Sequence, residues 1–273
     1  HRDLHSFPTR RSSDLAIAGE FAKGFNSVIM ENHGTVVGGT NLIEAYERFE
    51  AMEFCGRTLI NSKSVGEPRF LNEEQLLAFD HQIPHDLPEL DEVIVASDEK
   101  EIRAEIVRIV RRACDQGLMM STYGTASVRW RGNNFLITKT NVTRWNIDLD
   151  DIVQIRDGKR EPGKIPSRAT WLHHEIYRRN PHVNAVIMTQ PPYLMAFGAT
   201  HEHMDVKTIP ESWIFLQDMP NLPFGSQFAG KTDIPDLIGK KVAAVLVNND
   251  AVIVTGKTLL QASVNPYVTV VGP

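Results

Sequence analysis

His33 is a candidate metal ligand, because it lies in the stretch ENHGTVVGG, residues 31–39, between two short apolar runs. Residues 27–30 and 35–37 form these runs, and the glycine between them favours a tight turn. A neutral imidazole at such a turn is a good zinc ligand if it faces a pocket. The alternative is a half-buried turn residue without a metal. A zinc site needs further ligands, so the organisation of the whole chain decides between these interpretations.

The sequence around His33 recurs near the C-terminus. Residues 28–45, VIMENHGTVVGGTNLIEA, align with residues 245–262, VLVNNDAVIVTGKTLLQA, at a constant shift (250 − 33 = 217). Asp250 and Ala251 stand where the first copy has His33 and Gly34. A period this long indicates a duplicated domain rather than a solenoid. Identical pairs are Val28/Val245, Asn32/Asn249, Val37/Val254, Gly39/Gly256, Leu42/Leu259 and Ala45/Ala262.

The duplication predicts the domain organisation. Residues 16–62 are expected to be the C-terminal part of a first domain, residues 63–97 a proline-containing linker, and residues 98–273 a second, degenerate domain, either complete or truncated. Residues 1–15, HRDLHSFPTRRSSDL, have no apolar periodicity and resemble translated sequencing-adapter read-through. We expect this segment to be non-native and disordered; a disordered natural N-terminus is the alternative.

Composition restricts the class of protein. The 273 residues carry a net charge of −5, which argues against a general nucleic-acid binder. No apolar run approaches the roughly 18 residues needed to span a bilayer, so we expect no membrane segment. Cys55 and Cys114 have no ligand-like spacing and are expected to be buried, reduced thiols. These features favour a cytoplasmic protein.

The periodicity of apolar residues predicts a layered α/β fold that combines helices with antiparallel strands. A hairpin is expected around residues 131–134, RGNN, and the chain beyond Pro210 reads as loop-rich. Helices are predicted over residues 41–61, 72–80, 97–114, 170–179 and 234–241, and strands over residues 126–130, 135–138, 152–156 and 183–188.

Four motifs in the same order resemble the class II aldolase/adducin family. They are STYGTASVRW (121–130), FLITKTNVTRWNIDLDDIVQI (135–155), IPSRATWLHHEIYRRNPHVNAVIMTQPPY (165–193) and the NHG turn at 32–34. The resemblance implies an α/β (α+β) domain of three layers, with a mainly antiparallel sheet of nine strands between helices. It also implies a homo-oligomer, often a tetramer with sites between subunits.

The resemblance further implies where zinc would bind. In active members the strand corresponding to residues 183–190 ends in a His-x-His, and the NHG turn supplies the third ligand, which makes His33 a metal ligand of the first repeat. The second repeat has Met188, Gln190 and Asp250 at these positions. A thioether, an amide and one carboxylate are a poor donor set for zinc. We expect zinc in the intact parent protein and none in this chain.

The catalytic base is altered as well. Active members take it from the glutamate of a Pro-Ser-Ser-Glu turn, and the second repeat has Ala169 there. A methyl group cannot transfer a proton. The partners of His33 would lie upstream, outside this chain, so we expect no complete active site and no catalytic residue in it.

The phosphate-binding elements of the family are altered less. The second repeat keeps a glycine, hydroxyl groups and an amide at these positions, and it adds a guanidinium that could hold an oxyanion in a bidentate manner. The alternative is that this arginine is a solvated surface charge. The predicted anion-binding residues are Gly124, Thr125, Thr140, Asn141, Ser167 and Arg168.

Two functions remain open at this point. The chain is expected to be a fragment of a zinc-dependent aldehyde-lyase or epimerase that acts on small sugar phosphates, with a pseudoenzyme second domain. The alternative is a non-catalytic module, used either for adducin-like assembly or for regulation through a bound anionic metabolite. The remaining histidines favour neither function, because His201 and His203 lie in a polar loop and His173 lies on a predicted helix.

Overall fold

The computed structural model describes residues 10–80, 86–94, 96–216, 218–228, 230, 232–239 and 242–263. The chain forms two compact units, His1–Glu53 and Phe54–Pro273. The division falls inside helix α2 (Leu42–Ser62), nine residues before the expected domain end at residue 62 (62 − 53 = 9). Within the described residues, no helix is both long enough and apolar enough to cross a bilayer.

The first unit contains helix α1 (Arg10–Ala22), a hairpin of β1 (Ser27–Met30) and β2 (Gly34–Val37), and the start of α2. The hairpin pairs Ser27 with Val37, which is the arrangement predicted for the NHG turn. The expectation that residues 1–15 are disordered does not hold for residues 10–15, which belong to α1. The helix as a whole contains arginine, alanine and leucine, which are good helix formers. Residues 1–9 of the adapter-like stretch lie outside the described residues.

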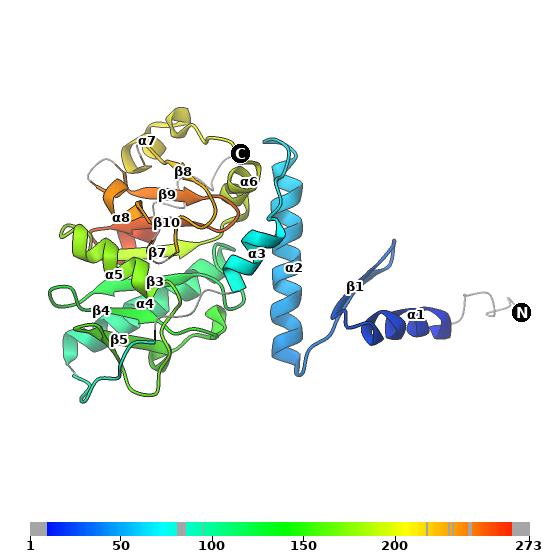
Figure 1. Ribbon diagram of the computed structural model, residues 1–273, viewed down its shortest axis with the longest axis horizontal. Helices are drawn as coiled ribbons and strands as arrows, with labels where there is room; N and C mark the ends of the chain where they lie inside the picture. The colour runs from blue at the N-terminus through cyan, green and yellow to red at the C-terminus, as the bar shows by residue number, and fades with distance from the viewer. Residues whose placement is uncertain are drawn as a thin grey trace, which may run out of the picture. The chain divides into compact units, whose positions relative to one another are not determined.

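The second unit is built on an eight-stranded sheet, one strand fewer among the described residues than the resemblance implies. All neighbouring strands are antiparallel except β8 and β9, and the strand order is β6-β5-β4-β3-β7-β10-β9-β8. Figure 1 shows this order from β5 to β8. The strands are β3 (Thr125–Arg129), β4 (Phe135–Thr138), β5 (Ile152–Arg156), β6 (Lys159–Arg160), β7 (Ala185–Thr189), β8 (Asn221–Leu222), β9 (Ala244–Val247) and β10 (Ala251–Gly256).

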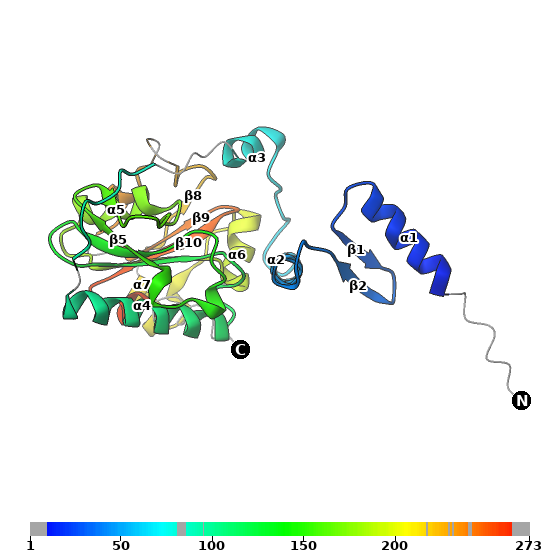
Figure 2. The same ribbon diagram turned by 90° about the horizontal axis from the view of Figure 1, so that it is seen from below.

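Helices cover both faces of this sheet, as Figure 2 shows for α4 (Ser97–Asp115) and α5 (Thr170–Arg179). Ile106 and Val110 of α4 are completely buried in the core on one face. Ile176 and Tyr177 of α5 are completely buried in the core on the other face, together with residues of α8 (Ile234–Leu237). The predicted three-layer α/β architecture is therefore confirmed.

The predicted ranges of helices and strands agree best with the structure where the periodicity of apolar residues is strong. The ranges of β4, β5 and α5 match the predictions, and α4 is one residue longer than expected. The helix expected over residues 234–241 ends at Leu237, because Ile238 is extended (φ −67°, ψ 128°) and Gly239 follows.

Three expectations about individual segments are wrong or incomplete. The connector holds α3 (Glu73–Asp80) as predicted. Helix α6 (Pro192–Thr200) is not among the predicted helices, and α7 (Pro210–Leu216) lies in the part of the chain that is expected to be loop-rich. Proline tolerates the first turn of a helix, so these segments can be helical despite their prolines. Cys55 is exposed rather than buried, Cys114 is partly buried, and neither forms a disulfide.

Candidate functional site

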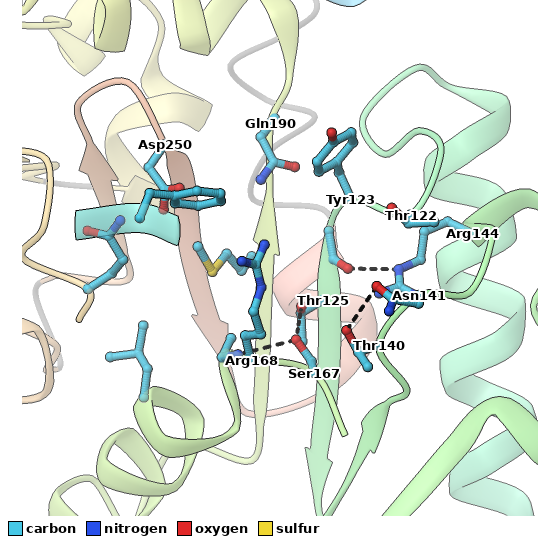
Figure 3. Close-up of a pocket in the computed structure, with 16 residues that line it drawn as sticks. Thr122, Tyr123, Thr125, Thr140, Asn141, Arg144, Ser167, Arg168, Gln190 and Asp250 are labelled. Carbon is cyan, nitrogen blue, oxygen red and sulfur yellow. Dashed lines mark hydrogen bonds between the residues drawn. The ribbon is translucent and has the colours of Figure 1, made fainter. Parts of the chain in front are cut away.

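A cavity of about 160 Å³ lies at one edge of the sheet in the second unit (Figure 3). Its wall includes every predicted anion-binding, base and metal position of the second repeat. The residues of the anion-binding, base and metal positions are Gly124, Thr125, Thr140, Asn141, Ser167, Arg168, Ala169, Met188, Gln190 and Asp250. Their functional roles remain predictions, but the fold places all of them around one cavity.

Strand order explains why these residues meet. Strand β7 lies between β3 and β10 and is antiparallel to both, so its end lies beside the starts of these two strands. Met188 pairs with Thr125 on one side and with Ile253 on the other. Gln190 directly follows β7, and Asp250 directly precedes β10. Residues about 60 positions apart in the chain therefore share one edge of the sheet (250 − 190 = 60).

Hydroxyl groups line the lower part of the cavity in Figure 3. The Oγ atoms of Thr125 and Ser167 are 2.7 Å apart, and both residues are buried. The backbone amide of Ser167 donates to the Thr138 carbonyl at 3.0 Å, which fixes the Pro-Ser turn against the end of β4. Such preorganised hydroxyl and amide groups suit a phosphate, whose oxygens accept several hydrogen bonds.

Gly124 is required by the turn before β3. Its φ is +92°, in the left-handed region that favours glycine. A Cβ atom at this position would lie 2.8 Å from Met119 Cγ, in the packed interior. The turn therefore brings the backbone close to the cavity without a side chain in the way.

Arg144 connects two sides of the cavity, and it is not among the predicted site residues. Its Nε donates to the Gly124 carbonyl at 2.8 Å, and its Nη1 donates to the carbonyls of Lys139 at 3.1 Å and Val142 at 2.9 Å. Burial lowers the pKa of this guanidinium to about 10. Arg144 stays charged at neutral pH and fixes both the Gly124 turn and the Thr140–Asn141 turn. No spacing pattern in the sequence marks this role.

The three metal positions, which all line the cavity, do not fit zinc. Met188 supplies a thioether and Gln190 an amide, and neither belongs to the usual zinc ligands. Asp250 is the single carboxylate, and its Oδ2 is buried without a hydrogen-bond partner. Burial raises the pKa of Asp250 to about 6, although the charge of Arg168 opposes this shift. Across the described parts of the chain, no group of three or more His, Cys, Asp or Glu side chains could hold a metal ion.

His33 lies at the turn between β1 and β2, in the first unit. Its side chain is exposed, and its backbone amide donates to the Met30 carbonyl at 3.1 Å. Asp250 repeats this turn geometry, because its amide donates to the Val247 carbonyl at 3.2 Å. The two residues are therefore equivalent in local structure, as their alignment predicts.

Two other histidines, His173 and His201, have local hydrogen-bond partners. His173 is completely buried, its Nδ1 is 2.7 Å from Ser127 Oγ, and burial lowers its pKa to about 3. This residue is a neutral part of the core and does not line the cavity. His201 Nε2 is 2.7 Å from Asn249 Oδ1, in a hydrogen bond that joins two loops.

Comparison with known families agrees with this geometry. The family described as Class II Aldolase and Adducin N-terminal domain matches residues 3–60 and 104–269. The chain therefore belongs to the class II aldolase/adducin family. The match begins inside the adapter-like segment and falls in two parts, one around each copy of the duplicated stretch.

Individual relatives cover much of the second unit. L-fuculose phosphate aldolase from Methanococcus vannielii is 29% identical over 166 residues, which is 60% of this chain and 89% of that protein. A 3-oxo-tetronate 4-phosphate decarboxylase from Escherichia coli is 25% identical over 178 residues, which is 62% of this chain and 83% of that protein. The crystal structure of YgbL from Escherichia coli has a TM-score of 0.56 at 22% identity, covering 63% of this chain and 89% of that one, and shows the shared fold.

Proposed function

We propose that the second unit binds a small phosphorylated sugar or sugar acid and performs no metal-dependent aldol chemistry. One observation carries this proposal: the predicted phosphate-binding turns and the replaced metal and base positions line the same cavity. The turns keep their glycine and hydroxyl groups, whereas Ala169 and Met188 supply neither a base nor a metal ligand. The names of the two relatives, an aldolase and a decarboxylase of phosphorylated compounds, support a phosphorylated ligand.

In this proposal the residues of the chain bind and orient, and none transfers a proton. One hydroxyl of the hydrogen-bonded pair Thr125–Ser167 donates to a phosphate oxygen, and the Thr140 hydroxyl donates to another. Arg144 keeps the turns in position because its guanidinium binds three of their carbonyls. Preorganised donors lower the entropy cost of binding, so affinity does not require catalysis.

Ligand binding by a pair of variants tests this function. Isothermal titration with L-fuculose 1-phosphate or inorganic phosphate should show binding, because the donors are already in place. Ser167→Ala should weaken binding about five- to tenfold, since it removes one hydrogen bond to a charged group. Ser64→Ala is the control, because Ser64 is exposed and lies outside the cavity. Equal affinity for the wild type and Ser167→Ala would contradict the proposal.

For the longer parent protein, we infer a cytoplasmic zinc-dependent aldehyde-lyase or epimerase whose active site is in the first repeat. The equivalence of His33 and Asp250 in local structure supports this inference, since only the first repeat retains a histidine at the turn. In a gene product that includes the upstream residues, His33→Ala should lower both zinc content and lyase rate by orders of magnitude. Asp250→Ala should change neither, and the reverse pattern would refute the assignment.

A second candidate function is non-catalytic assembly, as in adducin-like proteins. Large apolar side chains on the first part of α2 favour it, because Leu42 is 85% exposed and Ile43 is 60% exposed. Exposed apolar residues this close together are typical of an interaction surface. Homo-oligomerisation through this surface is compatible with ligand binding in the second unit, and sedimentation of Ile43→Asp would test it.

A further inference from the structure

Two charged groups at the cavity lack partners for their polar atoms. The guanidinium of Arg168 lies over the ring of Phe79, with Cζ 4.7 Å from the ring centroid, but within the described structure it has neither a hydrogen bond nor an ion pair. Asp250 Oδ2 is buried and has no donor. Burial raises the pKa of Asp250 and the charge of Arg168 opposes this rise, so the two groups interact at a distance without a direct ion pair.

These groups lie apart from the hydroxyl groups. Figure 3 shows Thr125, Ser167 and Thr140 in the lower part of the cavity. The Arg168 side chain leaves the Ser167 turn and extends toward Gln190 and Asp250 in the upper part. The cavity therefore has one end that suits a phosphate and another end where a cation and an acceptor oxygen both lack partners.

Resting on the proposed function, we propose that the second unit selects a phosphorylated polyhydroxy acid, whose carboxylate is held by Arg168 and whose neighbouring hydroxyl donates to Asp250 Oδ2. A guanidinium matches a carboxylate because two of its N–H groups donate in parallel to the two oxygens. The buried acceptor needs a donor, and a hydroxyl group next to the carboxylate provides one. The phosphate then occupies the hydroxyl end.

The aromatic contact strengthens this assignment. Phe79 comes from α3, in the connector, and its ring makes a cation–π contact with the guanidinium. A side chain that is already oriented loses less entropy when it binds a ligand. Arg168 is exposed overall, so a ligand can reach it from solvent. The competing assignment is that Arg168 contacts the phosphate, together with Ser167.

A matched pair of ligands separates the two assignments. D-erythronate 4-phosphate and D-erythritol 4-phosphate share four carbons and a phosphate, but only the first has a carboxylate. Wild-type protein should bind the erythronate about tenfold more tightly or better, since a bidentate charged pair is worth at least this factor. Arg168→Met should remove the preference and change the affinity for erythritol 4-phosphate by less than about twofold.

Arg131→Met is the control, because Arg131 pairs with Asp98 and lies outside this cavity; it should keep the full preference. Circular dichroism of each variant confirms folding. Equal affinities of the wild type for the two ligands would overturn the inference while leaving the proposed function intact. A preference for the erythronate that survives Arg168→Met would do the same. An equal loss of affinity for both ligands in Arg168→Met would assign Arg168 to the phosphate instead and would also overturn the inference. Failure of both ligands and of inorganic phosphate to bind wild type would refute the proposed function itself.

Discussion

The hairpins β1–β2 and β9–β10 have the same backbone geometry in different surroundings. Ser27 pairs with Val37, and at the shift of 217 residues Ala244 pairs with Val254. Asn32 and Asn249, at the two turns, have nearly the same positive φ, 54° and 58°. Turn and register are therefore determined by the local sequence, because both copies keep them despite the change from His33 to Asp250.

The two hairpins differ in how far their residues are buried. Every residue of β9 is buried, as are five of the six residues of β10, whereas no residue of β1 or β2 is buried. Strand β10 pairs with β7 as well as β9, while β1 and β2 form a two-stranded sheet. Local sequence therefore determines the shape of the turn, whereas the neighbouring strands determine how much each residue contributes to stability.

The largest expected difference concerns the helices that follow the two hairpins. Leu259 is 1% exposed and its equivalent Leu42 is 85% exposed. Leu259→Ala should destabilise the second unit by about 2–5 kcal/mol, because it leaves a cavity in the core. Leu42→Ala should change stability by less than about 0.5 kcal/mol.

Urea unfolding followed by tryptophan fluorescence measures this difference, since all four tryptophans lie in the second unit. Similar losses for Leu42→Ala and Leu259→Ala would show that the hairpins have equivalent surroundings after all.

The turn residues should differ in their pH dependence. Burial raises the pKa of Asp250 to about 6, so the folded state favours the protonated carboxyl. This contribution is fully present below the unfolded pKa of about 3.9, and it is lost as pH rises through about 6. Asp250→Asn stays neutral and should be more stable than wild type at pH 8 by on the order of 2–3 kcal/mol.

At pH 4 the wild type and Asp250→Asn should be nearly equal. Unfolding curves at both pH values measure the effect, and His33→Asn, at the exposed equivalent turn, is the control. A constant difference between pH 4 and pH 8 would show that the Asp250 carboxyl is not the titrating group.

A smaller effect is expected at the glycine after each hairpin. A Cβ atom on Gly256 would lie 2.7 Å from the Ala262 amide nitrogen, and one on Gly39 would lie 2.6 Å from the equivalent Ala45 nitrogen. Gly256→Ala should lower the stability of the second unit by about 1–2 kcal/mol, because backbone atoms must move. Gly39→Ala should leave the main unfolding transition unchanged. Equal shifts would mean that the two units unfold together.

The sequence predicts the shared features of the two hairpins well, because they depend on residues close together in the chain. The duplicated stretch and the strands with alternating or continuous apolar residues locate β4, β5, β9 and β10. The motifs also identify ten residues of the cavity wall. Their convergence follows from strand order, which the family resemblance supplies and the periodicity alone does not.

Other features of the site depend on contacts between distant residues. Arg144 binds carbonyls on two turns, and nothing near it in the sequence indicates that its guanidinium is buried. Phe79 comes from a segment that reads as a linker. The unpartnered Oδ2 of Asp250 results from packing around the turn, so the alignment predicts its position and not its environment.

The metal dependence of ligand binding in the second unit is the decisive measurement for a cavity without zinc. Purified chain is divided into a sample dialysed against EDTA and a sample loaded with zinc, and both are titrated with L-fuculose 1-phosphate. We expect the same affinity in both samples, because Met188, Gln190 and Asp250 do not form a zinc site. Binding that requires zinc, with one zinc retained per chain in a variant lacking His201 and His203, would contradict this expectation.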